Sequence, residues 1–263
     1  MQWSVISAVN NEKVLKTCLL DSPGIESAAE VILQRGYASA ASAYNAAMQK
    51  AKTDLLVFVH QDVYLPEGWI EAVQKALETL SQQDPNWGVV GVWGAVDGEK
   101  RVGYLCWTGD LGWKEPFEGG KEVASLDEVV LIFRKSAGLV FDERLPGYHL
   151  YGADICAEAR RRGRKCYAIS ALCIHNTNTE RMLPLQFWKC YWFMRRKWKD
   201  SLPIDTPCTR ITFWCWPMIR WHLVCLRDLA LGRRKRLVRA DNPGEIYAGL
   251  LARGVVPQNE AKR

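Results

Sequence analysis

Two residues with metal-ligand chemistry stand just behind apolar segments of the chain. Asp62 comes three residues after the end of the apolar run Leu55–Val59, and His175 directly follows the apolar run 166–174. A rigid carboxylate at a strand end suits a hard divalent cation, which takes one or two carboxylates together with phosphate oxygens. Imidazole can also ligate Mn²⁺. The alternatives are an Asp that caps a turn and a hydrogen-bonded surface His.

Polar residues also end other predicted strands. Asn10 and Asn11 close the first apolar run, and His60 and Gln61 immediately precede Asp62. In open α/β sheets, ligands bind outside the carboxyl ends of the strands. We therefore expect these residues to meet at one rim of a sheet, together with the His that ends the later strand.

Apolar segments of strand length alternate with segments of helical spacing over the first two thirds of the chain. Strands are predicted at 3–9, 29–33, 55–59, 88–93, 128–133 and 166–174, and helices at 12–20, 42–51, 69–80 and 151–162. This alternation predicts an α/β fold with a Rossmann-like, mainly parallel sheet and helices on both of its faces.

Asp154 opens the predicted helix 151–162. Asp is a favoured N-cap residue, and a carboxylate in a pocket can also act as a general base toward a hydroxyl group. Two further acidic pairs, at 127–128 and 142–143, are compatible with a site or with surface charge. The local sequence does not separate these alternatives.

The composition is that of an ordinary globular protein. With 263 residues, 48% hydrophobic and 24% charged, the chain can form one large α/β domain with or without a C-terminal appendage. Nine cysteines without a Cys-x-x-Cys pair indicate reduced thiols rather than disulfides or a zinc site. The first residues lack signal-peptide features, and no apolar run reaches the ~18–20 residues of a membrane span. We therefore expect a cytoplasmic location.

Aromatic and basic residues characterise the chain beyond residue 178, so we predict a domain over 1–178 and an extension over 179–263. Two helices are expected in the extension, at 183–199 and 211–227. Such helices can lie in a membrane interface, with aromatic rings at the acyl boundary and cations at the head groups. Alternatively, the rings pack against the α/β layer. Nucleic acid is the least favoured partner, because no binding-module pattern accompanies the cations.

As an ordered set, these segments resemble the GT-A-fold, family-two-like glycosyltransferases. The run 4–12 is similar to their opening strand and loop, and 44–62 is similar to their N-x-G…A-x-G-D…D-x-D run. The run 141–156 is similar to their acceptor-side acidic motif, and His175 stands where many relatives place a metal-binding His. The resemblance covers roughly residues 3–178.

Three positions depart from the family pattern. His60 replaces the first Asp of the D-x-D, so the sequence matches a glycosyltransferase-like branch with His-Gln-Asp at that place. Ala153 stands where relatives commonly carry Glu, and the run 32–36 lacks the Asp that usually contacts the base of the nucleotide. These departures keep open a non-catalytic GT-A-like protein that binds a nucleotide sugar or a membrane surface.

The resemblance implies an inverting, metal-dependent transfer of a sugar from a nucleotide-diphosphate sugar to a hydroxyl group, with a UDP-sugar as the expected donor. Asp62 and His175 would hold Mn²⁺ or Mg²⁺, and Asp154 would take the acceptor proton. The expected nucleotide-sugar pocket consists of Asn10, Asn11, Ser42, Asn45, Gln61 and Asp62.

The same resemblance gives an expectation for the acceptor, a saccharide or a lipid-linked molecule. An enzyme of this kind would serve cell-envelope, surface-polysaccharide or glycolipid synthesis, as a peripheral protein at the inner face of the membrane. Trp107 and Trp113 are candidates for stacking on sugar faces, and ordinary packing is the alternative for each.

Overall fold

A seven-stranded sheet forms the centre of the molecule in the computed structural model, which describes residues 1–96, 100–108, 110–111, 116–178, 183–233, 238–254 and 256. In spatial order its strands are β10 (Gly120–Glu122), β13 (Cys166–Ile169), β5 (Val89–Gly91), β12 (Val130–Arg134), β3 (Leu55–Val59), β1 (Trp3–Val9) and β2 (Glu30–Arg35). Five of these strands run in one direction, and β12 and β10 run against them. The predicted mainly parallel sheet is confirmed.

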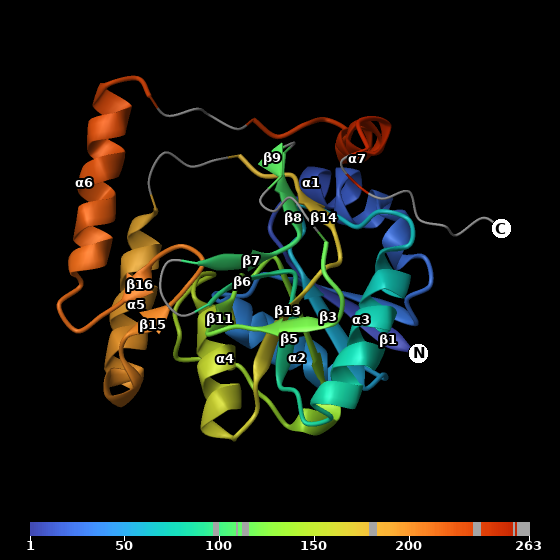
Figure 1. Cartoon of the computed structure of the whole chain (residues 1–263), viewed down its shortest axis with the longest axis horizontal. Helices are drawn as coiled ribbons and strands as arrows, with labels where there is room; N and C mark the ends of the chain where they lie inside the picture. Colours follow the sequence, from blue (N-terminus) through green and yellow to red (C-terminus); the bar gives the residue numbers. More distant parts are fainter. Residues whose placement is uncertain are drawn as a thin grey trace.

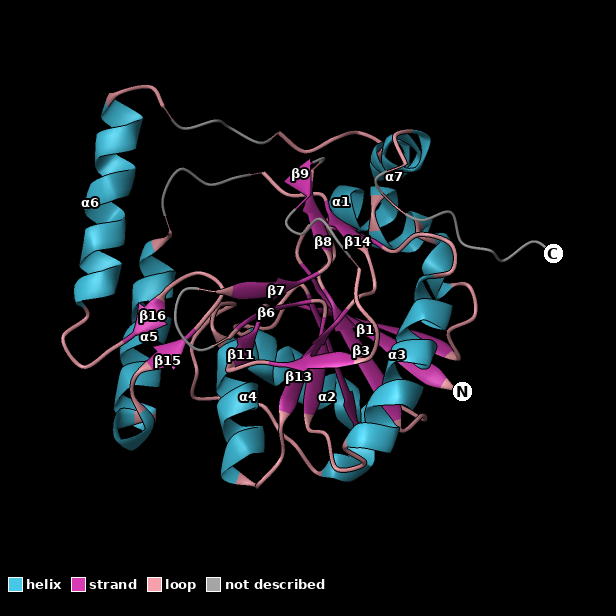
Figure 2. Cartoon of the chain, in the orientation of Figure 1, coloured by secondary structure: helices cyan, strands magenta, loops and turns pink. Residues whose placement is uncertain are grey.

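Helices cover the sheet because its central strands are apolar on both sides. All five residues of β3 are buried, as expected for a strand that lies between two layers. The helix α3 (Trp69–Gln83) lies in front of the strands in Figure 1, and α2 (Ala40–Lys50) lies behind them. Two further helices, α1 (Glu12–Thr17) and α4 (Tyr151–Arg161), also lie beside the sheet (Figure 2).

The predicted strand 166–174 is in fact two strands in two different sheets. β13 stays in the main sheet, whereas β14 (Cys173–His175) joins β4 (Val63–Tyr64), β8 (Leu105–Trp107) and β9 (Asp110–Leu111) in a four-stranded sheet. A continuous apolar run carries no period that would reveal such a change of sheet. The change matters for the site, because β14 pairs with the short strand that directly follows Asp62.

The remaining strands form two small sheets. β11 (Ser125–Leu126), β6 (Trp93–Ala95) and β7 (Arg101–Gly103) make one sheet, and β15 (Ile204–Asp205) and β16 (Arg210–Ile211) make the other. The predicted strand 88–93 is thus divided between the main sheet and the sheet of β6 and β7.

The C-terminal extension contains α5 (Leu185–Lys197), α6 (Trp216–Ala230) and α7 (Pro243–Ala252). α5 and α6 lie side by side at one edge of the molecule, where Trp188 donates a hydrogen bond to His222 (Figure 1). The sequence did not predict α7, which returns to the α/β layer and packs Leu250 into a small core with Ile174 and Cys106. The division at residue 178 stays a prediction. Within the described chain, no helix combines the length and apolar character that crossing a membrane requires.

Candidate metal centre

His60, Asp62 and His175 form a compact group at the end of β3. Their potential ligand atoms all lie within 4.8 Å of one another. His175 Nε2 is 3.3 Å from Asp62 Oδ1, and the His60 and His175 ring centroids are 5.6 Å apart. The structure therefore brings together the two predicted metal ligands and adds His60 to them.

Backbone pairing fixes this group. His60 N donates to Val129 O at 3.1 Å, so the end of β3 is held against the segment that leads into β12. His175 lies opposite Val63 in the antiparallel β4–β14 ladder, and Asn176 N donates to Asp62 O at 2.8 Å. Because backbone groups in a ladder have little freedom, the Asp62 and His175 side chains are positioned before any ligand arrives.

The two histidines differ in protonation. Burial lowers the pKa of His60 to about 4, so its imidazole is neutral at pH 7, and its Nε2 lies 2.7 Å from the Tyr151 hydroxyl. Burial also opposes the charged form of His175, but the adjacent Asp62 carboxylate outweighs burial and raises the pKa of His175 above its ordinary value. His175 is therefore protonated more readily than His60, and metal binding would compete with that protonation.

Asp62 is ionised. Burial alone would raise the pKa of its carboxyl group, but His175, His60 and Arg239 together hold that pKa below its ordinary value. Two imidazoles and one carboxylate make a mixed nitrogen and oxygen donor set. Such a set fits Mn²⁺ better than Mg²⁺, which prefers oxygen ligands and near-ideal octahedral geometry. His175 Nδ1 is buried and finds no hydrogen-bond partner among the described residues.

Gln61 ties the first loop to this centre. Its Oε1 accepts hydrogen bonds from Asn10 N and Asn11 N, both at 3.0 Å, and its Nε2 donates to Asn10 Oδ1. Asn11 Oδ1 also accepts from Val14 N and so caps α1. The three predicted pocket residues Asn10, Asn11 and Gln61 therefore lie together, and Gln61 directly precedes Asp62 in the chain.

The structure does not bring Ser42 and Asn45 to the metal group. Asn45 is buried, and its side-chain amide bonds the segment after β12. Its Nδ2 donates to Phe141 O and Glu143 Oε1, and its Oδ1 accepts from Phe141 N. Ser42 bonds Ser39 at the start of α2. Both residues stabilise the packing of α2 rather than face the ligand group.

Asp154 is held in an ion pair with the C-terminal extension. Lys197 Nζ lies 2.8 Å from both carboxylate oxygens, and Trp198 Nε1 donates to one of them at 2.8 Å. Asp154 is only 3% exposed, and burial raises the pKa of its carboxyl group despite Lys197. None of its recorded partners belongs to the metal group, so the structure does not bring the predicted base and the predicted metal ligands together.

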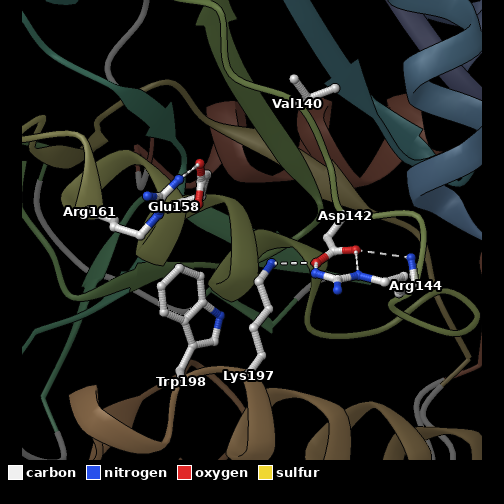
Figure 3. A pocket seen from close by; sticks show the side chains of 7 residues that line it. All are labelled: Val140, Asp142, Arg144, Glu158, Arg161, Lys197 and Trp198. Atoms are coloured by element: carbon white, nitrogen blue, oxygen red, sulfur yellow. Dashed lines mark hydrogen bonds and ion pairs between the residues drawn. The ribbon is translucent and has the colours of Figure 1, made fainter.

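Lys197 also reaches Asp142 at 2.9 Å, as Figure 3 shows. The hollow beside this contact is lined by Val140, Asp142, Arg144, Glu158, Arg161, Lys197 and Trp198. Asp154 is not among the lining residues. Its carboxylate therefore acts as a buried tie between α4 and α5 in this structure.

Glu128 and Tyr151 are neighbours of the metal group that the sequence did not single out for it. The Tyr151 hydroxyl bonds His60 Nε2 at 2.7 Å and Glu128 O at 3.3 Å. Burial, followed by the charge of Asp127, raises the pKa of Glu128 to about 8. Glu128 is half-buried, and its backbone carbonyl lies beside the metal group. The local sequence could not indicate this location, because acidic residues beside a strand are common.

Arg239 is a further neighbour that sequence reasoning missed. Its Nη2 lies 3.1 Å from Asp62 Oδ2, and its Nε donates to Asn176 O at 2.7 Å. In the sequence, Arg239 is one of the many basic residues beyond residue 178, and nothing in its local sequence sets it apart. Of the two candidate stacking residues, Trp107 is half-buried and packs edge-on against Trp93, and Trp113 lies outside the described residues.

The sheet is mainly parallel with one central antiparallel strand, and the His/Asp/His group lies at the end of β3, where open α/β sheets bind their ligands. The family model described as "Glycosyltransferase like family" matches residues 4–187, which is more than half of the chain. The chain belongs to this glycosyltransferase-like family.

Similar structures agree with the fold. GalNAc-T7, solved with UDP, GalNAc and Mn²⁺, superposes with a TM-score of 0.51 at 12% identity, over 77% of this chain and 52% of that one. S. aureus TarS gives a TM-score of 0.48 at 17% identity, over 78% of this chain and 40% of that one. The "ATP synthase subunits region ORF 6" of Fuscovulum blasticum is 29% identical over 129 residues, 46% of this chain. The chain matches about half the length of that curated relative.

The Asp154 tie predicts a specific loss of stability. Lys197→Met should lower the free energy of unfolding by about 2–4 kcal/mol, because it leaves a buried carboxylate without its cation. Urea unfolding at pH 7 measures the effect, with the exposed Lys199→Met as the matched control. The double variant Asp154→Asn/Lys197→Met should recover part of the loss. Equal stability of Lys197→Met and Lys199→Met would contradict the assignment.

Proposed function

We propose that this member of the family is a Mn²⁺-dependent, inverting transferase that moves a sugar from a UDP-sugar to a hydroxyl acceptor. The convergence of His60, Asp62 and His175 at the end of β3 is the observation that carries the proposal. A GT-A fold shared with GalNAc-T7, whose structure contains UDP, GalNAc and Mn²⁺, supports the same choice of donor and metal.

In this proposal His60, Asp62 and His175 hold the ion. When bound, Mn²⁺ supplies charge neutralisation for the diphosphate leaving group. Gln61 holds Asn10 and Asn11 in the loop after β1, and this loop forms one wall of the nucleotide site. The Tyr151 hydroxyl keeps the His60 ring oriented, as hydrogen-bonded neighbours of metal ligands do in general.

Inversion requires a base that receives the proton of the acceptor hydroxyl. Asp154 is the candidate from the sequence, but both of its oxygens are engaged by Lys197. Glu128 is the alternative: its backbone carbonyl accepts a hydrogen bond from the Tyr151 hydroxyl that also contacts His60, so this residue lies beside the metal group. A carboxyl group with a raised pKa near the working pH is suited to proton transfer.

Gly152 leaves the space that Glu128 uses. A Cβ atom at residue 152 would lie 2.6 Å from Leu126 O and 3.3 Å from Glu128 Cγ, so any larger residue would collide there. The start of α4 therefore carries no side chain at this point, and the carboxyl group comes from the β11–β12 connection instead. We propose that Glu128 is the base and that Asp154 has the structural role of joining α4 to α5.

The first test concerns the metal and the donor. Asp62→Asn should weaken UDP binding in the presence of Mn²⁺ by roughly tenfold or more, because metal affinity depends strongly on each ligand and its neighbours. Isothermal titration calorimetry with UDP, with and without Mn²⁺, measures this loss. The exposed Asp21→Asn is the control. Unchanged binding by Asp62→Asn would refute the metal site.

The second test separates the two candidate bases. Glu128→Gln should slow release of UDP from UDP-sugars by about 10²–10⁴-fold, whereas Asp154→Asn should mainly lower stability. Because the base acts as a carboxylate, the wild-type rate should rise with pH and level off above about 8, the pKa of Glu128. Glu128→Gln should lose that dependence.

The opposite outcome assigns the base to Asp154: a folded Asp154→Asn without activity and an active Glu128→Gln. A wild-type protein that binds UDP but turns over none of UDP-glucose, UDP-galactose and UDP-N-acetylglucosamine would favour the non-catalytic, nucleotide-sugar-binding alternative.

A surface on the extension supports a membrane-bound acceptor. The outer side of α6 and the segments beside it expose large apolar residues: Trp192, Phe213, Trp214, Trp216, Ile219, Leu223, Leu226 and Leu231. We call these residues, together with Arg195 between Trp192 and Phe213, the aromatic-basic surface. An exposed helix that is apolar on its outer side as well as its inner side indicates a binding partner.

Charge selects the partner. Residues 183–233 contain nine Lys and Arg against three Asp. Trp214 is 79% exposed and Trp216 is 61% exposed, and Arg195 stacks between Trp192 and Phe213. Exposed rings interleaved with cations fit the interface of an anionic bilayer. We propose that this surface rests on such a bilayer and presents the enzyme to a lipid-linked acceptor of the cell envelope.

The membrane proposal predicts that Trp214→Ser/Trp216→Ser/Leu223→Ser abolishes co-sedimentation with phosphatidylglycerol-containing vesicles. Pure phosphatidylcholine vesicles should bind the wild-type protein more weakly, because they lack the negative surface potential. The control is Leu20→Ser/Val31→Ser/Val140→Ser, which removes exposed apolar side chains from the α/β layer. Equal binding by both triple variants would contradict the proposal, and a dimer broken by the first variant would assign the surface to a second copy of the chain.

A further inference from the structure

Both oxygens of Asp62 are engaged in this structure. Oδ1 faces His175 Nε2 at 3.3 Å, and Oδ2 accepts a hydrogen bond from Arg239 Nη2 at 3.1 Å. Arg239 comes from the segment between α6 and α7, 177 residues away in the sequence. A guanidinium group therefore occupies part of the space around the carboxylate to which a metal ion would bind.

The position of Arg239 is built by the fold. Asn176, fully buried directly after His175, donates from Nδ2 to Ala240 O at 2.8 Å and accepts from Ala240 N at 2.9 Å. Arg239 N donates to Asn178 Oδ1 at 2.8 Å. Three hydrogen bonds thus clamp the backbone on both sides of the arginine side chain.

The charges create a competition. With no cation bound, Arg239 forms an ion pair with one oxygen of Asp62, and His175 Nε2 faces the other oxygen. A divalent ion at Asp62 would lie close to the guanidinium, and two positive charges a few ångströms apart repel each other. A diphosphate removes this conflict, because its negative oxygens can accept both the ion and the forked N–H groups of arginine.

We propose that Arg239 is an exchangeable counter-ion that pairs with Asp62 in the metal-free protein and turns to the diphosphate when the ion and the nucleotide bind together. This inference rests on the function proposed for the site. Its consequence is thermodynamic coupling: Mn²⁺ binds weakly alone, UDP strengthens its binding, and Mn²⁺ strengthens UDP binding by the same factor. The fixed backbone lets the side chain exchange partners without a movement of the chain.

Calorimetric titration of Mn²⁺, with and without saturating UDP, tests the coupling in the full-length chain. In the wild-type protein UDP should strengthen Mn²⁺ binding roughly tenfold or more, within the usual range of coupling between sites. Arg239→Gln should bind Mn²⁺ alone more tightly than the wild type, bind UDP more weakly, and lose most of the coupling. Arg233→Gln, an exposed arginine at the end of α6, is the control and should behave as the wild type.

Arg239→Lys provides a second measurement, because it keeps the cation but lacks the fork. It should retain weak binding of Mn²⁺ alone and still lose UDP affinity. A wild type with coupled binding, together with an Arg239→Gln that binds Mn²⁺ alone no more tightly, overturns the counter-ion role and leaves the metal site intact. A wild type that binds no Mn²⁺ even with UDP overturns both this inference and the function proposed for the site.

Discussion

The ionised carboxylate of Asp62 has to exist in a place from which most water is excluded. Burial alone would favour its protonated form, and an unpaired buried charge is costly. The groups that lower its pKa come from three separate segments: His60 from the same turn, His175 from β14, and Arg239 from the C-terminal extension. The short β4–β14 ladder holds His175, and the hydrogen bonds of Asn176 to Ala240 hold the segment that carries Arg239. The local architecture of the rim follows from this electrostatic requirement.

The same requirement distinguishes two histidines that look equivalent in the sequence. His60 faces the Tyr151 hydroxyl and is neutral, whereas His175 faces the carboxylate and is more readily protonated. In the metal-free rim, His175 and Arg239 therefore both face the Asp62 carboxylate. A divalent ion would bind between Asp62 and the histidines, but it would also have to accommodate the guanidinium. Because a diphosphate can accept both the ion and the guanidinium, the negative charge of the donor affects how strongly the site binds the metal.

Sequence patterns predicted the parts of the fold that local physics determines. β1 and β3 were placed at the right residues because each is a short, largely apolar run with a polar end. The proximity of Asp62 and His175 was also predicted, although His175 reaches Asp62 through a strand of another sheet, a change that an apolar run does not reveal. The engagement of Asp154 by Lys197 and of Asp62 by Arg239 joins residues 43 and 177 positions apart. No local spacing encodes such contacts, so a capping Asp and a basic cluster gave no indication of them.

The composition changes near residue 178, but the electrostatics of the molecule do not stop there. Lys197 neutralises the buried Asp154 of α4, and Arg239 contacts Asp62 at the rim, so the extension supplies a cation to each of two buried carboxylates of the α/β layer. α7 then closes a small core against β14, the strand that carries His175. If α6 rests on a bilayer as proposed, the chain that follows α6 carries Arg239, the arginine that competes with the metal ion for Asp62. Contact with the acceptor surface and occupancy of the donor site would then be properties of one continuous stretch of chain.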